Sequence, residues 1–195
     1  MNYNKKFIAG FITFSLLIVV SVLSAQTTFQ MGDSQKFVVK GTSTIHDWDM
    51  ESEGARGQAQ IVIEDGELKD IESLSVQVPV KSMKSGSNRM DRTAYSAIEA
   101  DDHQYIQFDL TRVRNITSEH VLATGTLTIA GNTRTVSVRT NYQVNGNSVQ
   151  FYGDQDISFS QFDLDPPTAM LGSIRTGDNL EVSFDVNFDS SSRAK

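Results

Sequence analysis

The chain has 195 residues, enough for one domain or two small ones. Its 24 acidic and 17 basic residues give a formal net charge of −7, which disfavours nucleic-acid binding, because such binders neutralise phosphates with Lys and Arg. The chain contains no cysteine, so a disulfide framework, a zinc–thiolate site, an iron–sulfur cluster and a cysteine nucleophile are all excluded.

The first 25 residues have the layout of a secretory signal peptide. Lys5 and Lys6 precede an almost wholly apolar run over 7–23, and Ser24 and Ala25 then offer small residues for cleavage before Gln26. This layout predicts a periplasmic or secreted protein. An uncleaved membrane anchor is the alternative, since the run approaches the ~20 residues that span a bilayer.

Short segments of alternating apolar and polar residues follow, joined by turn residues such as Asp65 and Gly66. Such segments predict an antiparallel β-sandwich or β-barrel. Even-numbered positions carry the apolar residues over 74–80, 106–110 and 180–188, so these side chains are expected to face one interior. The predicted strands are Phe37–Val39, Gln60–Glu64, Leu74–Val80, Ile106–Leu110, Leu127–Ile129, Val136–Val138, Tyr142–Val144, Val149–Phe151, Ile157–Phe159 and Leu180–Phe188.

Two segments favour short helices. Ser87–Ile98 has apolar residues at helical spacing, with Ser87 as the cap. Asp165–Gly172 has a capping Asp, Pro at the start and Gly at the end. The predicted organisation is a signal peptide (1–25), an N-terminal leader (26–34), one barrel domain (35–189) and a flexible tail (190–195).

Several segments together resemble the YceI-like family of lipid- and polyisoprenoid-binding proteins. They are Gly41–Trp48, Val78–Gly86, His103–Phe108 and Gly125–Arg134, of which the last is the most specific; in His103–Phe108 the residues Gln104 and Tyr105 replace the usual Tyr-Pro. The resemblance implies an all-β, eight-stranded antiparallel, lipocalin-like barrel. It also implies an elongated apolar pocket for a prenyl-type chain, and a binding activity without catalysis.

If the barrel carries lipid, aromatic, Met and Val side chains should line its pocket, and polar residues at the mouth should contact the headgroup. The lining candidates are Trp48, Val78, Met90, Tyr95, Phe108, Phe151, Phe159, Met170 and Phe184. The headgroup candidates are His46, Arg89 and Arg92. The expected partner is a polyisoprenoid or quinone-like lipid, held for carriage or sequestration with transient membrane contact, and no nucleic acid, metal or cofactor is expected.

Other interpretations stay open at this point. The barrel could instead have a filled core and act as a secreted interaction or stress-response protein, because composition alone does not distinguish the two. His46 and Asp47 would point to opposite faces of a regular strand, whereas His46 and Trp48 would share one. Asp101, Asp102 and His103 could bind a cation, but a polar loop between helix and strand is the more common explanation for such a cluster.

The targeting segment gives the first testable prediction. N-terminal sequencing of the exported protein should find a mature chain that begins near Gln26. An exported protein that still carries Met1 would identify the apolar run as an anchor.

Overall fold

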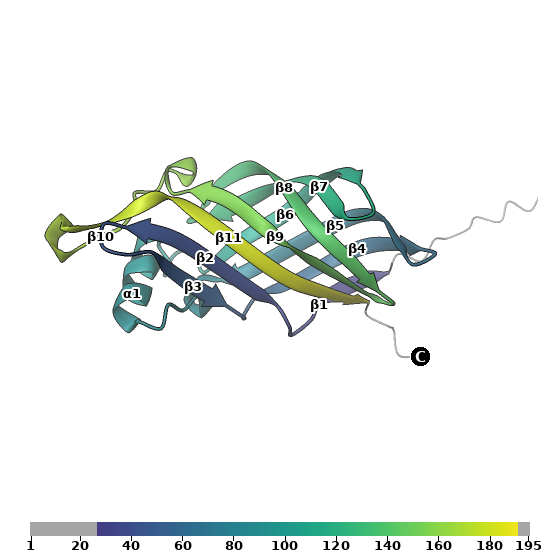
Figure 1. Ribbon diagram of the computed structural model, residues 1–195, viewed down its shortest axis with the longest axis horizontal. Helices are drawn as coiled ribbons and strands as arrows, with labels where there is room; N and C mark the ends of the chain where they lie inside the picture. The colour runs from purple at the N-terminus through teal and green to yellow at the C-terminus, as the bar shows by residue number, and fades with distance from the viewer. Residues whose placement is uncertain (1–26, 191–195) are drawn as a thin grey trace, which may run out of the picture.

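The described chain, residues 27–190 of a computed structural model, winds into one antiparallel barrel (Figure 1). The predicted signal peptide and the tail beyond Ser190 lie outside the described residues. The strands are β1 (Thr28–Met31), β2 (Lys36–Ser43), β3 (Trp48–Ser52), β4 (Arg56–Glu64), β5 (Glu67–Pro79), β6 (Tyr105–Ile116), β7 (His120–Ile129), β8 (Asn132–Asn145), β9 (Ser148–Ser158), β10 (Thr168–Ala169) and β11 (Ile174–Ser190). The helices are α1 (Asn88–Ala97) and the 3₁₀ turns η1 (Val80–Ser82), η2 (Ser160–Phe162) and η3 (Met170–Gly172).

Eight strand positions close the barrel, which confirms the predicted fold class. Their order is β1, β4, β5, β6, β7, β8, β9 and β11, and β11 pairs back with β1. Along one edge, β11 pairs with β9. Along its other edge, β11 pairs first with β2 and then, near its C-terminal end, with β1. Since β3 pairs with β2 and β4 pairs with β1, two of the eight positions are built from two short strands each.

Gln35 ties these two interrupted positions together. It lies in the break between β1 and β2, and its side-chain amide donates to the carbonyl oxygens of Glu53 (2.8 Å) and Ala55 (2.9 Å) in the break between β3 and β4. Gln35 is buried, so these two bonds satisfy carbonyl groups that have no neighbouring strand at this point.

The barrel interior is filled at one end only. A continuous core occupies the end that contains β1 and the later part of β11, where Val149 and Phe188 are fully buried and the rings of Phe151 and Phe188 meet edge to face. Towards the other end, inward side chains of the same strands are only half-buried, among them Leu180 and Val182. Figure 1 shows α1 and β10 at this second end.

The α-helix α1 fits its predicted boundaries. Ser87 caps it, and the Ser87 hydroxyl accepts from the backbone N–H of Met90. No helix within residues 27–190 is long and apolar enough to cross a membrane. Because β3 has no strand partner beyond β2, η1 and α1 lie beside its free edge, where Glu51 and Lys84 form an isolated bridge.

Four sequence predictions need correction. The predicted leader contains β1, which belongs to the barrel. The predicted strands over 136–138 and 142–144 are one strand, β8, because pairing with β7 and β9 keeps the polar residues between them extended. Likewise β9 joins 149–151 to 157–158. The predicted helix at Asp165–Gly172 is an extended segment that forms β10 and then a tight turn, since pairing with β11 satisfies its backbone.

The Gln35 contact predicts a stability effect. Gln35→Leu should lower the free energy of unfolding by about 1–3 kcal/mol, because the buried carbonyl group of Ala55 and the part-buried one of Glu53 lose their donor. Urea denaturation measures it, with Gln143→Leu at an exposed position of β8 as the control, for which a change within about 0.5 kcal/mol is expected. Equal stability of the two variants would show that Gln35 does not hold the two breaks together.

Candidate functional site

A cavity of about 670 Å³ occupies the second end of the barrel. Its size is within the ~300–1,000 Å³ range of small-molecule sites. β2 contributes Phe37, Val39 and Ser43 to its wall, a span of about 20 Å at ~3.3 Å per residue. With strands tilted by roughly 40°, the cavity is about 15 Å deep. It opens to solvent between the β2–β3 turn, α1 and the segment around β10.

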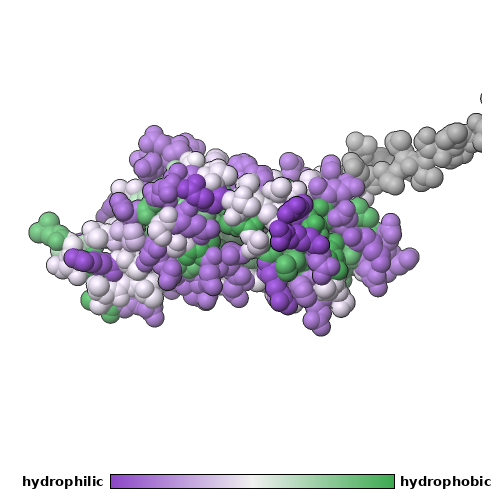
Figure 2. All heavy atoms as spheres, turned by 90° about the horizontal axis from the view of Figure 1, so that it is seen from above, coloured by the Kyte–Doolittle hydropathy of each residue, from purple (hydrophilic) through white to green (hydrophobic). Residues whose placement is uncertain are grey.

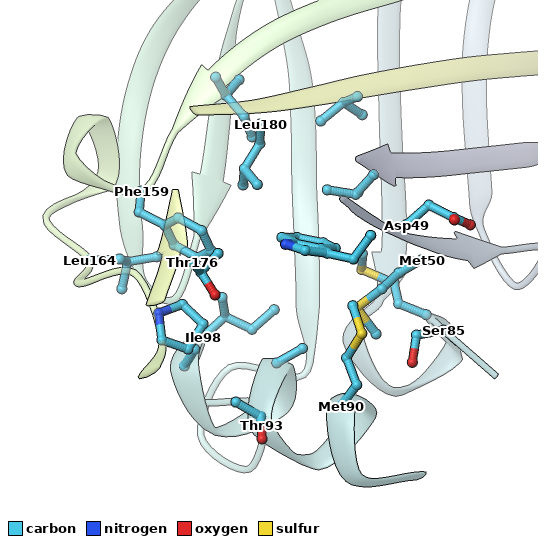
Figure 3. Close-up of a pocket in the computed structure, with 18 of the residues that line it drawn as sticks. Asp49, Met50, Ser85, Met90, Thr93, Ile98, Phe159, Leu164, Thr176 and Leu180 are labelled. Atoms are coloured by element: carbon cyan, nitrogen blue, oxygen red, sulfur yellow. The ribbon is translucent and has the colours of Figure 1, made fainter. Parts of the chain in front are cut away.

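The wall below the mouth is apolar. Inward residues of β2, β3, β5, β6, β7, β9 and β11 provide most of it, and α1 closes one side with Met90 and Ala94, followed by its C-cap Ile98. Figure 3 shows Met90 and Thr93 of α1 across the cavity from Leu180 of β11. The strand residues of the wall include Val76, Val78, Ile106, Phe108, Leu127, Ile129, Ile157, Leu180 and Val182.

Two aromatic rings of the wall lie directly on glycines. A Cβ atom added to Gly41 would lie 2.3 Å from the Trp48 ring, and one added to Gly125 would lie 2.4 Å from the Phe108 ring. Gly41 and Trp48 are cross-strand partners, so the missing side chain of one makes room for the indole of the other. The glycines therefore let large rings lie flat against the wall, and the space in front of them stays open.

Polar side chains are concentrated at the rim. They are Ser43, His46, Asp47, Asp49, Ser85, Ser87, Arg89, Thr93, Ser158 and Thr176. His46 and Asp47 both line the cavity, contrary to the expectation from a regular strand, because residues 44–47 form a turn. The Ser43 hydroxyl holds this turn by accepting from the backbone N–H groups of Ile45 and His46.

A buried carboxylate fixes α1 against the rim. Asp91 is 5% exposed, and its Oδ1 accepts from the backbone N–H (2.9 Å) and the hydroxyl (2.6 Å) of Ser85. The hydrogen bond from the Ser85 hydroxyl is the main reason why the pKa of Asp91 lies below its ordinary value. Since Met90 and Thr93 adjoin Asp91 on the helix, this contact positions the helical side of the cavity.

Seven of the predicted site residues line the cavity. Val78, Met90, Phe108 and Phe159 lie on its wall or floor. Trp48, His46 and Arg89 lie nearer the mouth. Their placement makes contact with a bound molecule sterically feasible.

The other five predicted residues lie elsewhere. Phe151 and Phe184 point inward but lie deeper, in or against the filled core, because alternation gives the face of a strand and not the level along the barrel. The Tyr95 hydroxyl lies 2.6 Å from the carbonyl oxygen of Met83, which turns the ring away from the cavity. Arg92 is exposed on α1, and Met170 is 57% exposed at the end of the molecule.

Sequence reasoning missed several wall residues. Val39 of β2 and Met50 of β3 line the cavity. They were missed because these strands are short and interrupted, so their sequences show little periodicity. Met83 lies in a loop and yet is only 8% exposed. By contrast, Ile106 and Ile157 could have been predicted as wall residues from the sequence. Ile106 has the same parity as the predicted lining residue Phe108, and Ile157 lies within a predicted strand.

The acidic cluster after α1 has ordinary ionic partners. Asp101 pairs with Lys81 at 2.6 Å, and His103 lies 3.7 Å from Glu99. Within residues 27–190 no three His, Cys, Asp or Glu side chains are grouped so that they could hold a metal ion.

The sequence of the chain matches the YceI-like domain family over residues 22–188, which covers the whole barrel apart from its last two residues. The chain belongs to the YceI-like family. No curated protein matches it in sequence at a significant level.

Solved structures share this YceI-like fold at low sequence identity. A polyisoprenoid-binding domain from Saccharophagus degradans is 11% identical, with a TM-score of 0.67 over 85% of this chain and 99% of that one. BcnA from Burkholderia cenocepacia is 17% identical, with a TM-score of 0.65 over 78% and 95%. The Campylobacter jejuni YceI protein is 18% identical, with a TM-score of 0.55 over 70% and 82%.

The Asp91 contact predicts a pH-dependent stability. Because its pKa is lower in the folded chain than in the unfolded one, ionised Asp91 stabilises the fold above the ordinary value of 3.8, and this contribution is lost as the pH falls through the folded-state pKa. Asp91→Asn should therefore lower the unfolding free energy by about 1–3 kcal/mol at pH 7, and by less below pH ~4.

Chemical denaturation across that pH range measures the effect. Asp101→Asn is the matched control, since the Asp101–Lys81 pair also lowers a carboxyl pKa but is exposed to solvent, where ion pairs stabilise little. A constant difference between wild type and Asp91→Asn at all pH values would contradict this role of the ionised carboxylate.

Proposed function

We propose that this protein binds an apolar lipid of the polyisoprenoid or quinone-like class in the barrel cavity, as a periplasmic or secreted carrier. The observation that carries the proposal is the open, apolar cavity of about 670 Å³ in a barrel whose other end is filled. Membership of the YceI-like family and the polyisoprenoid-binding domain among its structural relatives support it. A barrel filled throughout, acting by surface interactions alone, would have no such space.

The shape of the cavity suits a chain with a small head. Each buried CH₂ group contributes about 0.8 kcal/mol relative to water, so a chain of several isoprene units gains on the order of 10 kcal/mol before ordering costs. The three Met side chains of the wall, Met50, Met83 and Met90, are flexible and can adapt to methyl branches. The half-buried rings of Phe37 and Phe108 mark the floor, where the filled core begins.

The rim favours a neutral head over a strongly anionic one. Arg89 is the only Lys or Arg side chain among the described residues that line the cavity, and Asp47 and Asp49 of the same lining carry the opposite charge. His46 and several hydroxyl groups supply hydrogen bonds of both kinds. A quinone or an alcohol fits this set better than a diphosphate, which would need a cluster of Arg or Lys.

Carriage follows from the energetics of transfer. The interior of a bilayer is as apolar as the cavity wall, so moving a prenyl chain between them changes its free energy little. The protein would then load lipid at a membrane where that lipid is abundant and release it at a membrane, across the aqueous compartment, where it is scarce. The predicted signal peptide is what supports a location outside the cytoplasm.

Narrowing the mouth tests the proposal. Ala169 of β10 lines the cavity and is half-buried, so Ala169→Trp should fill part of the opening while changing the unfolding temperature little. Delipidated wild type should take up geranylgeraniol, as detected by native mass spectrometry, and the variant should take up several-fold less.

Ala123→Trp is the control for overpacking. Ala123 is buried in the filled core, where a large ring is expected to cost about 1–3 kcal/mol or more. If Ala169→Trp proves equally destabilising and wild type binds no geranylgeraniol, the carrier proposal is wrong and a filled barrel is favoured.

A further inference from the structure

Three large apolar side chains project into solvent beside the cavity mouth. Leu171 is 108% exposed, Ile45 63% and Met170 57%. Among the described residues only two other large apolar side chains are exposed, Tyr105 and Tyr152, and both carry a polar hydroxyl. Figure 2 shows hydrophobic atoms at the tip of the molecule, at the end where Figure 1 places β10.

The backbone at this tip has an unfavourable conformation. Met170 (φ 53°) and Leu171 (φ 56°) are consecutive left-handed residues, and Gly172 follows with φ 86°. Left-handed backbone is rare for bulky side chains, because Cβ approaches the carbonyl oxygen. Neither burial nor an intramolecular packing contact compensates Leu171, so the fold holds an apolar side chain outward without a gain in its own stability.

The two loops that carry these side chains form one unit. The Thr44 N–H donates to the Arg175 carbonyl oxygen (3.0 Å), and the Arg175 N–H donates to the Thr44 hydroxyl (3.2 Å). The Thr44 hydroxyl also reaches the Ser173 carbonyl oxygen. Ile45 and the Met170–Gly172 turn are therefore fixed on the same side of the opening, which Ile45, Ala169 and Ile174 themselves line.

Two arginines lie at the base of the tip. Arg89 donates to the Met170 sulfur (3.3 Å), and the Arg175 Nε donates to the Gly172 carbonyl oxygen (3.3 Å). Asp163, on the preceding segment, is bound by Arg134 on the barrel wall, whereas Asp47 and Asp165 remain exposed nearby. The apolar tip would lie among the acyl chains of a phospholipid bilayer, and the guanidinium groups at its base would lie at the level of the phosphates.

We propose that Ile45, Met170 and Leu171 insert into the interface of a phospholipid bilayer, and so place the cavity mouth against the membrane from which its lipid comes. The role of this membrane contact, lipid exchange, rests on the proposed function. Membrane binding itself is tested independently of lipid uptake. Because the chain has a net charge of −7, attraction by overall charge is not the driving force, and binding should persist at high salt.

Flotation with phosphatidylcholine vesicles tests the insertion. Wild type should float with the vesicles at low and high salt, and Leu171→Asn should lower the partition coefficient by roughly 10- to 100-fold, the equivalent of one buried leucine. Asn adopts left-handed backbone readily, so this variant should fold. Tyr152→Asn removes a 41% exposed ring from the barrel wall instead, and should float like wild type.

The following results of flotation and light scattering would contradict the proposal. If wild type does not float, or if Leu171→Asn floats as well as wild type, the tip does not insert. If Leu171→Asn instead converts a dimer to a monomer in light scattering, a second copy of the chain is the partner. Uptake of geranylgeraniol from detergent should be equal in all three proteins, and its absence from wild type would refute the proposed function while leaving the flotation result to decide on the tip.

Discussion

Closure of the sheet on β11 is the constraint on which the rest of the structure depends. An open sheet of this length would leave two long edges of unpaired backbone groups, and β11 closes the sheet by pairing with β9 along one edge and with β2 and β1 along the other. The break between β1 and β2 is tolerated because Gln35 supplies hydrogen bonds to the facing break. Beyond that break β3 has a free edge, and α1 lies there and forms a side of the cavity.

The division of the interior separates stability from binding. Phe29, Val149 and Phe188 belong to the filled end and have no contact with the cavity, so they can stabilise the barrel whatever the cavity contains. The hollow end has a smaller buried cluster of its own, which includes Ile129, Ile157 and Phe162, and it shares its strands with the filled end. This arrangement allows wall residues such as Ile106 and Leu180 to remain partly exposed, which an isolated small barrel would tolerate poorly.

Alternation in the long strands was sufficient for an antiparallel β-sandwich or β-barrel, and the resemblance to the YceI-like family implied the closed, eight-stranded form. The sequence was also sufficient for α1, because Ser87 and the spacing of Met90 and Ala94 are local features. It was insufficient where geometry is global. Phe184 has the right parity for the interior but the wrong depth for the cavity. Asp165–Gly172 has the composition of a helix, and only pairing with β11 makes it extended. The outward Leu171 follows from a left-handed turn that no local pattern announces.

Trp48 is the only tryptophan of the chain, and it lies on the cavity wall over Gly41, with its indole N–H donating to the Thr42 carbonyl oxygen. The protein thus carries its one tryptophan fluorophore at the place where water and an apolar guest would exchange. Since the chain also has no cysteine, one introduced thiol would take an acceptor dye at a unique position. Loading and emptying of the barrel could then be followed in real time by energy transfer, with no change to the wall itself.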